Sequence, residues 1–325
     1  MEPAALQDLL SQTRILVVGD VMLDQYFWGE VRRISPEAPV PVFELGEISH
    51  TLGGAANVAA NLRGLGARAL LCGLVGADRE AEILRELADK AGIDLSAVIQ
   101  DPSRPTTVKT RIIARSQHLL RIDNENTSAP SAEIRENLKA RLEELLSEVQ
   151  AVILSDYAKG VLSSPAFCAW VVEEARRRHL PVFVDPKGTR WEKYTGATCI
   201  TPNRSEFHAL AQVLGLGDKS LEEGAREIVQ RFETSFTVIT LGAEGMFLYH
   251  PAEGSWHFPA RAREVYDVSG AGDTAVAALT AFYTVGLPLK EAVAYANLCA
   301  GIVVGKMGTR PVFWEEFEKA LKGGQ

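Results

Sequence analysis

One short stretch decides the expected fold of this chain, Asp267-Val268-Ser269-Gly270-Ala271-Gly272-Asp273-Thr274, which stands directly before an apolar helical pattern. Its two glycines permit a tight backbone turn. The helix that follows directs free N–H groups and the positive end of its dipole toward that turn. The stretch therefore predicts an anion-binding site, formed by the backbone of Gly270, Ala271 and Gly272.

The carboxylate of Asp273 has two interpretations. An isolated Asp at a helix start is most often a cap. The Gly-Ala-Gly run before it favours close approach of a ligand, so Asp273 is the candidate base that takes a proton from a hydroxyl during phosphoryl transfer. The stretch is not a Walker A loop, and no Gly-x-Gly-x-x-Gly follows the first expected strand. P-loop nucleotide binding and NAD-dependent oxidoreduction are therefore disfavoured.

A second glycine-rich segment contains Gly53 and Gly54, and Asn57 follows it. The paired glycines fit either close helix packing or a bare backbone against which a polyol binds, with Asn57 as donor and acceptor. Asp24 follows the first expected strand, and ligands of open α/β sheets bind at the carboxyl ends of strands. Asp24 is therefore a candidate acceptor of hydrogen bonds from sugar hydroxyls.

Two more segments follow expected strands. Asn203 and Glu206 fit a helix start as a capping arrangement. They equally fit a site for a nucleotide phosphate or a hydrated Mg²⁺, because Mg²⁺ keeps several waters and takes few protein ligands. The second segment, Thr240 to Gly245, is either an ordinary glycine turn or a cradle for phosphates.

Short apolar runs, such as Ile15–Val18 and Ala151–Leu154, alternate with helical patterns along most of the chain. Such runs fit strands of a parallel sheet that is buried on both faces, with helices on both sides. Further on, Met246–Tyr249 and Trp256–Phe258 predict an antiparallel hairpin. The sequence therefore predicts an α/β fold, and its length suits one large domain or two small ones.

Two segments, at about 26–44 and 104–124, interrupt that alternation. The first is rich in β-forming residues and proline. The second predicts two strands around a short turn, with Thr107, Lys109 and Arg111 on one face of the first strand. A half-polar sheet attached to a buried one predicts a small lid. The alternative is an exposed hairpin whose charges are solvated.

The composition excludes several classes of protein. The 325 residues include 34 Lys and Arg against 42 Asp and Glu, a formal charge of −8, which argues against broad nucleic-acid binding. The four cysteines are far apart in apolar runs, and the histidines lack metal-ligand spacing, so a disulfide framework or zinc site is disfavoured. No signal-peptide or membrane-span pattern is visible. We therefore expect a cytoplasmic protein without a nucleic-acid or membrane partner.

Together these segments resemble the ribokinase-like, PfkB-type sugar kinases. That family has a glycine-rich N-terminal signature and a C-terminal Asp-x-x-Gly-Ala-Gly-Asp, which match Gly53–Ala60 and Asp267–Asp273. Its Asn-x-x-Glu element matches Asn203 and Glu206. The resemblance covers nearly the whole chain and implies a single kinase domain, residues 1–325, with the lid formed by the insertions at about 26–44 and 104–124. It implies a three-layer α/β fold with a mainly parallel central sheet, helices on both faces and a small β lid.

The resemblance also implies a role for each matched residue. Asp273 is the expected catalytic base, Gly270–Gly272 the expected anion hole, and Glu206 the expected Mg²⁺ residue, acting through water. Some relatives need a monovalent cation, and the family's lid often pairs with a second lid in a homodimer. The expected ATP-binding residues are Asn203, Arg204, Ser205, Glu206, Thr240, Gly242, Gly245 and Asn297. The expected sugar-binding residues are Asp24, Gly53, Gly54, Asn57, Asp156, Lys159 and Lys187.

A narrower resemblance points to the heptose 7-phosphate kinases. It rests on Ile34–Pro41, Lys109–Arg111, Leu120–Asp123, Ser155–Gly160 and Val303–Thr309. Those enzymes use ATP to phosphorylate O1 of D-glycero-β-D-manno-heptose 7-phosphate, on the ADP-heptose route to lipopolysaccharide. The resemblance implies this activity for the chain. The alternatives are a PfkB-type kinase of an unphosphorylated sugar or nucleoside, and a catalytically silent regulator that binds sugar or nucleotide.

Two expectations about partners follow from the narrower resemblance. In many bacteria the heptose kinase is fused to a C-terminal nucleotidyltransferase, and because this chain ends at Gln325, a separate nucleotidyltransferase is expected, together with a phosphatase. The substrate's own phosphate needs a cation in an acidic protein. The candidates for that cation are Lys159, Lys187, Arg111 and Arg121.

Overall fold

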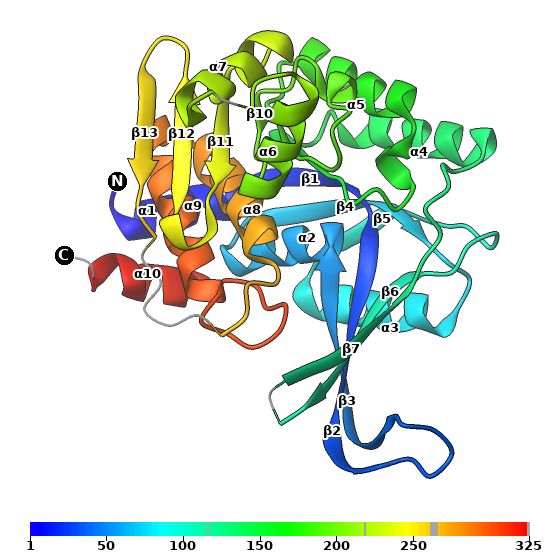
Figure 1. Cartoon of the computed structure of the whole chain (residues 1–325). Coiled ribbons are helices and arrows are strands. Elements are labelled where there is room, and N and C mark those ends of the chain that lie inside the picture. Colours follow the sequence, from blue (N-terminus) through cyan, green and yellow to red (C-terminus); the bar gives the residue numbers. More distant parts are fainter. Residues whose placement is uncertain (116, 218, 261–265, 324–325) are drawn as a thin grey trace.

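The apolar runs form a nine-stranded sheet in the computed structural model, which describes residues 1–115, 117–217, 219–260 and 266–323 (Figure 1). In spatial order its strands are β13 (Gly254–Phe258), β12 (Met246–His250), β11 (Phe236–Thr240), β10 (Cys199–Ile200), β9 (Val182–Asp185), β8 (Ala151–Ser155), β1 (Arg14–Gly19), β4 (Arg68–Val75) and β5 (Asp94–Gln100). From β11 to β5 neighbouring strands are parallel. The predicted hairpin of β12 and β13 is antiparallel and confirmed.

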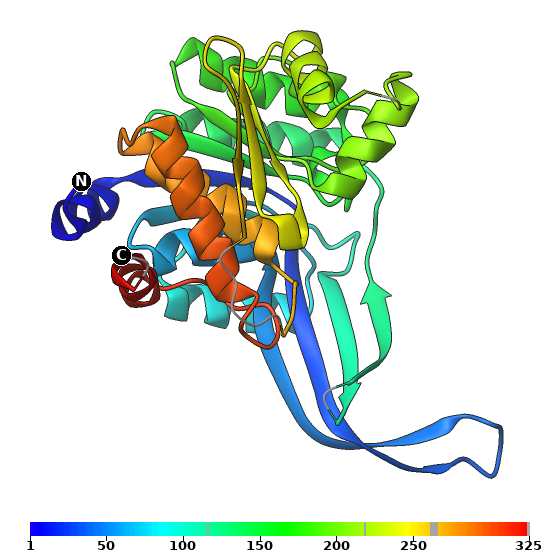
Figure 2. The ribbon, with the colours of Figure 1, turned by 60° about the vertical axis from the view of Figure 1, so that its left-hand side comes forward.

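Helices cover both faces of this sheet (Figures 1 and 2). On one face lie α1 (Pro3–Gln12), α2 (Ala55–Gly64), α3 (Arg79–Ala91), α8 (Ala271–Thr284), α9 (Leu289–Val303) and α10 (Trp314–Lys322). On the other lie α4 (Ala132–Leu145), α5 (Pro165–Arg177), α6 (Arg204–Val213) and α7 (Leu221–Arg231). Along β1, Ile15 and Val17 enter one core cluster while Leu16 and Val18 enter the other. Burial on both faces explains the unbroken apolar runs, and the three-layer prediction is confirmed.

A second, four-stranded sheet projects from this body (Figure 2). It consists of β3, β2, β6 and β7 in that order, with β2 and β6 parallel and the other pairs antiparallel. We call it the lid sheet. Its strands are β2 (Val21–Ile34), β3 (Pro41–Gly54), β6 (Thr107–Ala114) and β7 (Gln117–Asn124).

Strands β2 and β3 extend beyond the predicted insertion at 26–44, whereas β6 and β7 lie within the predicted insertion at 104–124. Strands β2 and β3 pair from their outer end to Val21 opposite Gly54, where β2 follows directly on β1 and β3 leads into α2. The first residues of β2 are buried, because they pass through the body before the strand emerges. Asp24 and Gly53 therefore belong to the lid sheet itself.

Two predictions from composition can be compared with the structure. All four cysteines are buried and free, as the apolar runs around them predict. Among the residues described, no helix combines the length and apolar character that crossing a membrane requires.

Candidate active site

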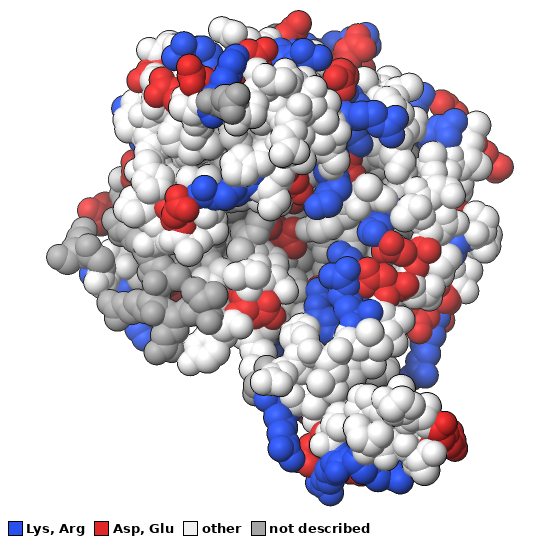
Figure 3. Space-filling view, in the orientation of Figure 1, with Lys and Arg blue, Asp and Glu red and all other residues white. Residues whose placement is uncertain are grey.

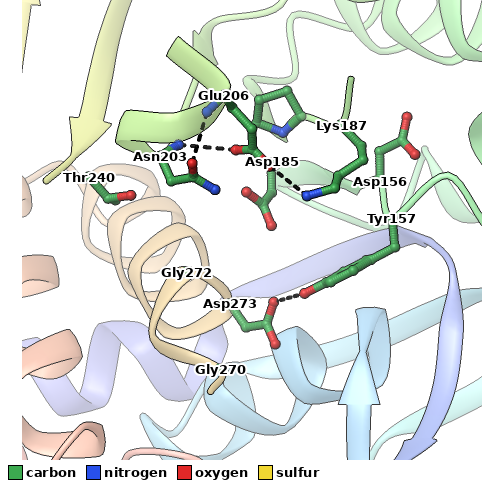
Figure 4. A pocket seen from close by; sticks show the side chains of 11 residues that line it. Asp156, Tyr157, Asp185, Lys187, Asn203, Glu206, Thr240, Gly270, Gly272 and Asp273 are labelled. Carbon is green, nitrogen blue, oxygen red and sulfur yellow. Dashed lines mark hydrogen bonds and ion pairs between the residues drawn. The ribbon is translucent and has the colours of Figure 1, made fainter. Parts of the chain in front are cut away.

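The candidate site lies at one edge of the main sheet, where several parallel strands end (Figure 4). Tyr157 follows β8, Asp185 ends β9, Asn203 follows β10, and Thr240 ends β11. The N-terminus of α8 meets the same edge and brings Asp273 into a cavity lined by all of these residues. The topology therefore gathers side chains that are far apart in the sequence, as the rule for parallel sheets predicts.

Asp273 is held from two sides. Asn57, on α2, donates its amide Nδ2 to Oδ2 of Asp273 over 2.7 Å, and the hydroxyl of Tyr157 donates to Oδ1. The carboxyl is buried, and this burial raises the pKa of Asp273 to about 6, although the two hydrogen bonds lower it and Lys109 lowers it further. A carboxyl whose pKa lies near neutrality is suited to accept a proton in catalysis.

Gly270 shows why the start of α8 requires a glycine. Its φ of +80° is left-handed, and a Cβ at this position would lie 2.8 Å from the Nδ2 of Asn57 that holds Asp273. In the first turn of α8, the backbone N–H groups of Gly272 and Asp273 have no partner among the described residues. Two free N–H groups at a helix start form a site for an anion beside the carboxylate.

At the side of the cavity formed by α6, Asn203 and Glu206 both cap the helix and line the cavity. Asn203 caps α6 by accepting from the N–H of Glu206, and the Glu206 carboxylate accepts from the N–H of Asn203, which makes a capping box. Glu206 also pairs with Lys187 over 2.9 Å. The capping interpretation is therefore confirmed, and the same side chains also line the cavity with Thr240 (Figure 4).

The other residues expected at ATP do not line this cavity. Arg204 pairs with Glu244 over 2.6 Å, and Ser205 is exposed on α6. Asn297, on α9, donates to the Pro259 carbonyl over 2.8 Å. Gly242 and Gly245 bound a short 3₁₀ turn (Gly242–Glu244) that leads into β12.

Asp24 lies on the lid side of the site, and each of its carboxylate oxygens accepts a hydrogen bond. Arg111 donates Nη1 to Oδ1 of Asp24, and Thr309 donates Oγ1 to Oδ2, each over 2.7 Å. Gly53 packs against this carboxylate so closely that a Cβ on it would lie 2.9 Å from Cγ of Asp24. Arg111 is therefore not a solvated charge, because it forms a buried ion pair with Asp24.

The expected sugar ligands Asp156 and Lys159 also have partners within the protein. The carboxylate of Asp156 points away from Asp273 and accepts from Lys193 over 2.5 Å and from Tyr194 over 2.6 Å (Figure 4). Lys159 pairs with Glu125 over 2.5 Å. Asp156 therefore orders the segment after β8 and also lines the cavity, so its contact with the sugar stays a prediction.

Three residues of the site escaped the sequence reasoning. Tyr157 bonds to Asp273, the half-buried Asp185 lines the cavity, and Lys109 lies over the ring of Tyr157 with its Nζ 5.0 Å from the ring centroid. Burial, reinforced by Asp273 and Glu206, raises the pKa of Asp185 well above its usual range. Tyr157 and Asp185 stand at the ends of neighbouring parallel strands. Their position after predicted strands could therefore have identified them from the sequence.

The charges around the site are of both signs. Figure 3 shows a hollow between the body and the lid sheet, with acidic side chains inside it and basic side chains at its rim. Within the described ranges, no group of three or more His, Cys, Asp or Glu side chains is arranged to hold a metal ion.

Comparison with known proteins decides the family. The sequence profile described as pfkB family carbohydrate kinase matches residues 12–316. The chain belongs to this family. It is therefore a sugar kinase, a phosphotransferase with the ribokinase-like fold that its glycine motifs predict.

Curated relatives give a finer comparison. "Bifunctional protein HldE" of Methylobacillus flagellatus is 46% identical over 312 residues, which cover 96% of this chain and 64% of the relative. The protein of the same name from Vibrio vulnificus is 43% identical over 311 residues, with coverages of 96% and 64%. The chain thus spans somewhat under two thirds of these relatives. Because their name describes two functions in one protein, the comparison does not support the expectation of a separate nucleotidyltransferase.

Solved structures support the fold. Arabidopsis thaliana ribokinase, complexed with ribose and ATP, has a TM-score of 0.74 and 21% identity over 95% of this chain and 99% of its own. Phosphofructokinase-2 from Escherichia coli, in complex with substrates and products, has a TM-score of 0.79 and 18% identity over 96% and 99%. At these identities the likeness confirms the ribokinase-like architecture.

Proposed function

We propose that the chain transfers the γ-phosphoryl group of ATP to O1 of D-glycero-β-D-manno-heptose 7-phosphate, giving the 1,7-bisphosphate on the ADP-heptose route to lipopolysaccharide. The observation that carries the chemistry is the buried Asp273 carboxyl, held by Asn57 and Tyr157 beside two free N–H groups of α8. The similarity to proteins named HldE supports the sugar. A phosphatase is then expected to act on the product.

The proposed reaction begins at Asp273. Its carboxylate takes the proton from the O1 hydroxyl as this oxygen forms a bond to the γ-phosphorus, and the bond from that phosphorus to the bridging oxygen breaks to release ADP. Asn57 and Tyr157 fix the carboxylate by binding one oxygen each. The N–H groups of Gly272 and Asp273 stabilise negative charge on the transferring group.

The α6 side of the cavity fits MgATP. Lys187 supplies a positive charge to the nucleotide phosphates, and Thr240 and the start of α6 supply polar contacts. Asp185 and Glu206 are the carboxylates that would hold Mg²⁺, with Glu206 acting through water. When bound, Mg²⁺ neutralises charge on the phosphates. The potassium bound to the Escherichia coli phosphofructokinase-2 makes a monovalent cation a further candidate cofactor.

The experiment replaces Asp273 by Asn and measures ADP formation with heptose 7-phosphate and ATP. We expect turnover to fall by about 10²–10⁴, the usual share of a general base, while binding of both substrates persists. For the wild type, ³¹P NMR of the product should show a second phosphorus at O1. Near-normal turnover by folded Asp273→Asn protein would remove Asp273 from this role.

The same assay separates the competing functions. Ribose, fructose and adenosine replace heptose 7-phosphate as acceptors in parallel reactions. Turnover confined to these compounds would establish a kinase of an unphosphorylated sugar or nucleoside. Binding of ATP and heptose 7-phosphate by the wild type without any ADP would establish a silent regulator.

The proposal includes a homodimer formed through the lid sheets. The face of the lid sheet opposite Lys109 carries one apolar side chain from each strand, in register: Ile48, Phe27, Ile112 and Leu120. Ile48 is 45% exposed and Leu120 is 55% exposed. An exposed apolar row on a sheet of this kind fits a contact between two copies of the chain. The ATP substrate and the free cysteines fit a cytoplasmic enzyme.

A further inference from the structure

Lys109 faces the active site from the lid sheet. Strands β2 and β6 pair in parallel with Asp24 opposite Lys109 and Tyr26 opposite Arg111. Residues directly opposite each other on neighbouring strands share a face of the sheet. The ion pair between Arg111 and Asp24, together with the Lys109 contact to Tyr157, shows that this face is turned toward Asp273.

The carboxylates nearest Lys109 are already occupied. Arg111 reaches diagonally to Oδ1 of Asp24 and Thr309 donates to Oδ2, and neither a hydrogen bond nor an ion pair joins Asp24 to Lys109, the residue directly opposite it. Both oxygens of Asp273 are bound by Asn57 and Tyr157. Among the described residues, the Lys109 ammonium makes neither a hydrogen bond nor an ion pair, and its one close contact is the Tyr157 ring.

Lys109 lacks a carboxylate partner in the described part of the chain, whereas other cations around the site have one. The cations that have carboxylate partners are Lys159 with Glu125, Lys187 with Glu206, Lys193 with Asp156, and Arg121 with Asp123. Lys109 is half-buried, and burial lowers its pKa although Asp24 and Asp273 raise it. A half-buried ammonium without an acceptor is unfavourable by itself, and an anionic ligand would supply the missing oxygens.

The position of Lys109 indicates which anion this is. Lys109 is not among the residues lining the cavity with Asn203, Glu206 and Thr240, where the nucleotide phosphates are expected. It stands on the lid side, with Asp24 as its cross-strand neighbour. An anion bound there belongs to the acceptor and not to the nucleotide.

We propose that Lys109 binds the phosphate that the sugar substrate already carries and thereby selects phosphorylated over unphosphorylated sugars. This inference rests on the proposed function, because it requires a sugar phosphate as acceptor. Each of the four cations that the sequence suggested for this phosphate has a carboxylate partner within the protein, whereas Lys109 has none among the described residues.

The test compares two acceptors, heptose 7-phosphate and the same heptose without phosphate. In Lys109→Met we expect kcat/KM for heptose 7-phosphate to fall about 10- to 100-fold, mainly through KM, as for the loss of a charged hydrogen bond. The value for the unphosphorylated heptose should fall much less, because for this acceptor only the influence of Lys109 on the pKa of Asp273 is lost. Lys109→Arg should recover part of the loss. Lys139→Met removes a lysine from α4, outside the site, and should leave both values unchanged.

The outcomes separate this inference from the proposed function. Wild-type protein that uses only unphosphorylated acceptors would overturn the proposed function and this inference together. Wild-type protein that prefers heptose 7-phosphate, with Lys109→Met equally selective, would overturn the inference alone. An equal loss on both acceptors, carried by kcat, would also overturn it, because it would place Lys109 at the transferred phosphoryl group.

Discussion

At the scale of single residues, the site is organised around one carboxyl that is both buried and bound. Desolvation raises the pKa of Asp273 to about 6, and the hydrogen bonds from Asn57 and Tyr157 limit that rise. The carboxyl is therefore ionised at neutral pH and still basic enough to accept a proton. Asn57 and Tyr157 also fix the orientation of the carboxylate, because each of them donates to a different oxygen.

The pH dependence of the reaction tests this description. Because only the ionised carboxylate is a base, kcat/KM for the sugar should rise with pH up to about 6 and level off above it. In Tyr157→Phe the carboxylate loses a hydrogen bond that lowers the pKa of Asp273, so the acid limb should move to higher pH. Initial rates from pH 4.5 to 8 measure both. An acid limb at the same pH in both proteins would assign it to another group.

The sequence predicted some of the polar residues that stand at strand ends or helix starts, but not Tyr157 and Asp185. Asp273, Asn57 and Glu206 were found in this way, because each belongs to a local pattern with a chemical meaning. The bond between Arg111 and Asp24 was not predictable, since it joins residues 87 positions apart through a strand register that neither segment reveals. Lys109 was missed for the same reason, because its lack of a partner depends on that bond.

At the scale of elements, two helices in different parts of the fold begin with the same capping motif. α6 and α7 each begin with a capping box, Asn203 with Glu206 and Ser220 with Glu223. Only the first lines the active-site cavity. A local pattern therefore describes the helix start correctly in both cases, and only the sheet topology determines which of the two can also contact a ligand.

This pair allows capping and function to be measured separately. Asn203→Ala and Ser220→Ala should each lower the free energy of unfolding by about 1 kcal/mol, because each removes the side-chain acceptor of a helix N-cap. Only Asn203→Ala should raise KM for ATP, since its cap is at the cavity. Urea unfolding and ATP kinetics on both variants provide the measurements. If the two variants have the same KM for ATP, Asn203 acts only as a helix cap.

The main sheet was predictable from sequence because burial on both faces leaves long apolar runs, whereas the lid sheet was predictable only in outline. In β2 and β3 the buried residues near the body, such as Leu23, give way to exposed ones toward the tip. No single pattern covers such a strand. Its inner end resembles the core and its outer end resembles a loop, so the sequence analysis recognised only the outer part.

At the scale of the whole molecule, the net charge of −8 restricts how anionic substrates can be bound. The proposed substrates are both anions, yet carboxyl groups gather at the active-site edge and most nearby cations are neutralised by them. Anion binding then depends on the start of α8, on the metal, on Lys187 at the nucleotide and on a cation without a carboxylate partner among the described residues. The lid sheet supplies such a cation on one face and an apolar row on the other.

The apolar row predicts how the whole molecule assembles. Leu120 lies on the outer face of β7, in register with Ile112, and a charge there would be buried without a partner in a lid-to-lid dimer. We expect the wild type to be a dimer and Leu120→Glu to be monomeric by size-exclusion chromatography with light scattering. Val213→Glu, at a 65% exposed position on α6, should remain dimeric. A monomeric wild type, or a dimer that survives Leu120→Glu unchanged, would show that this row is not the interface.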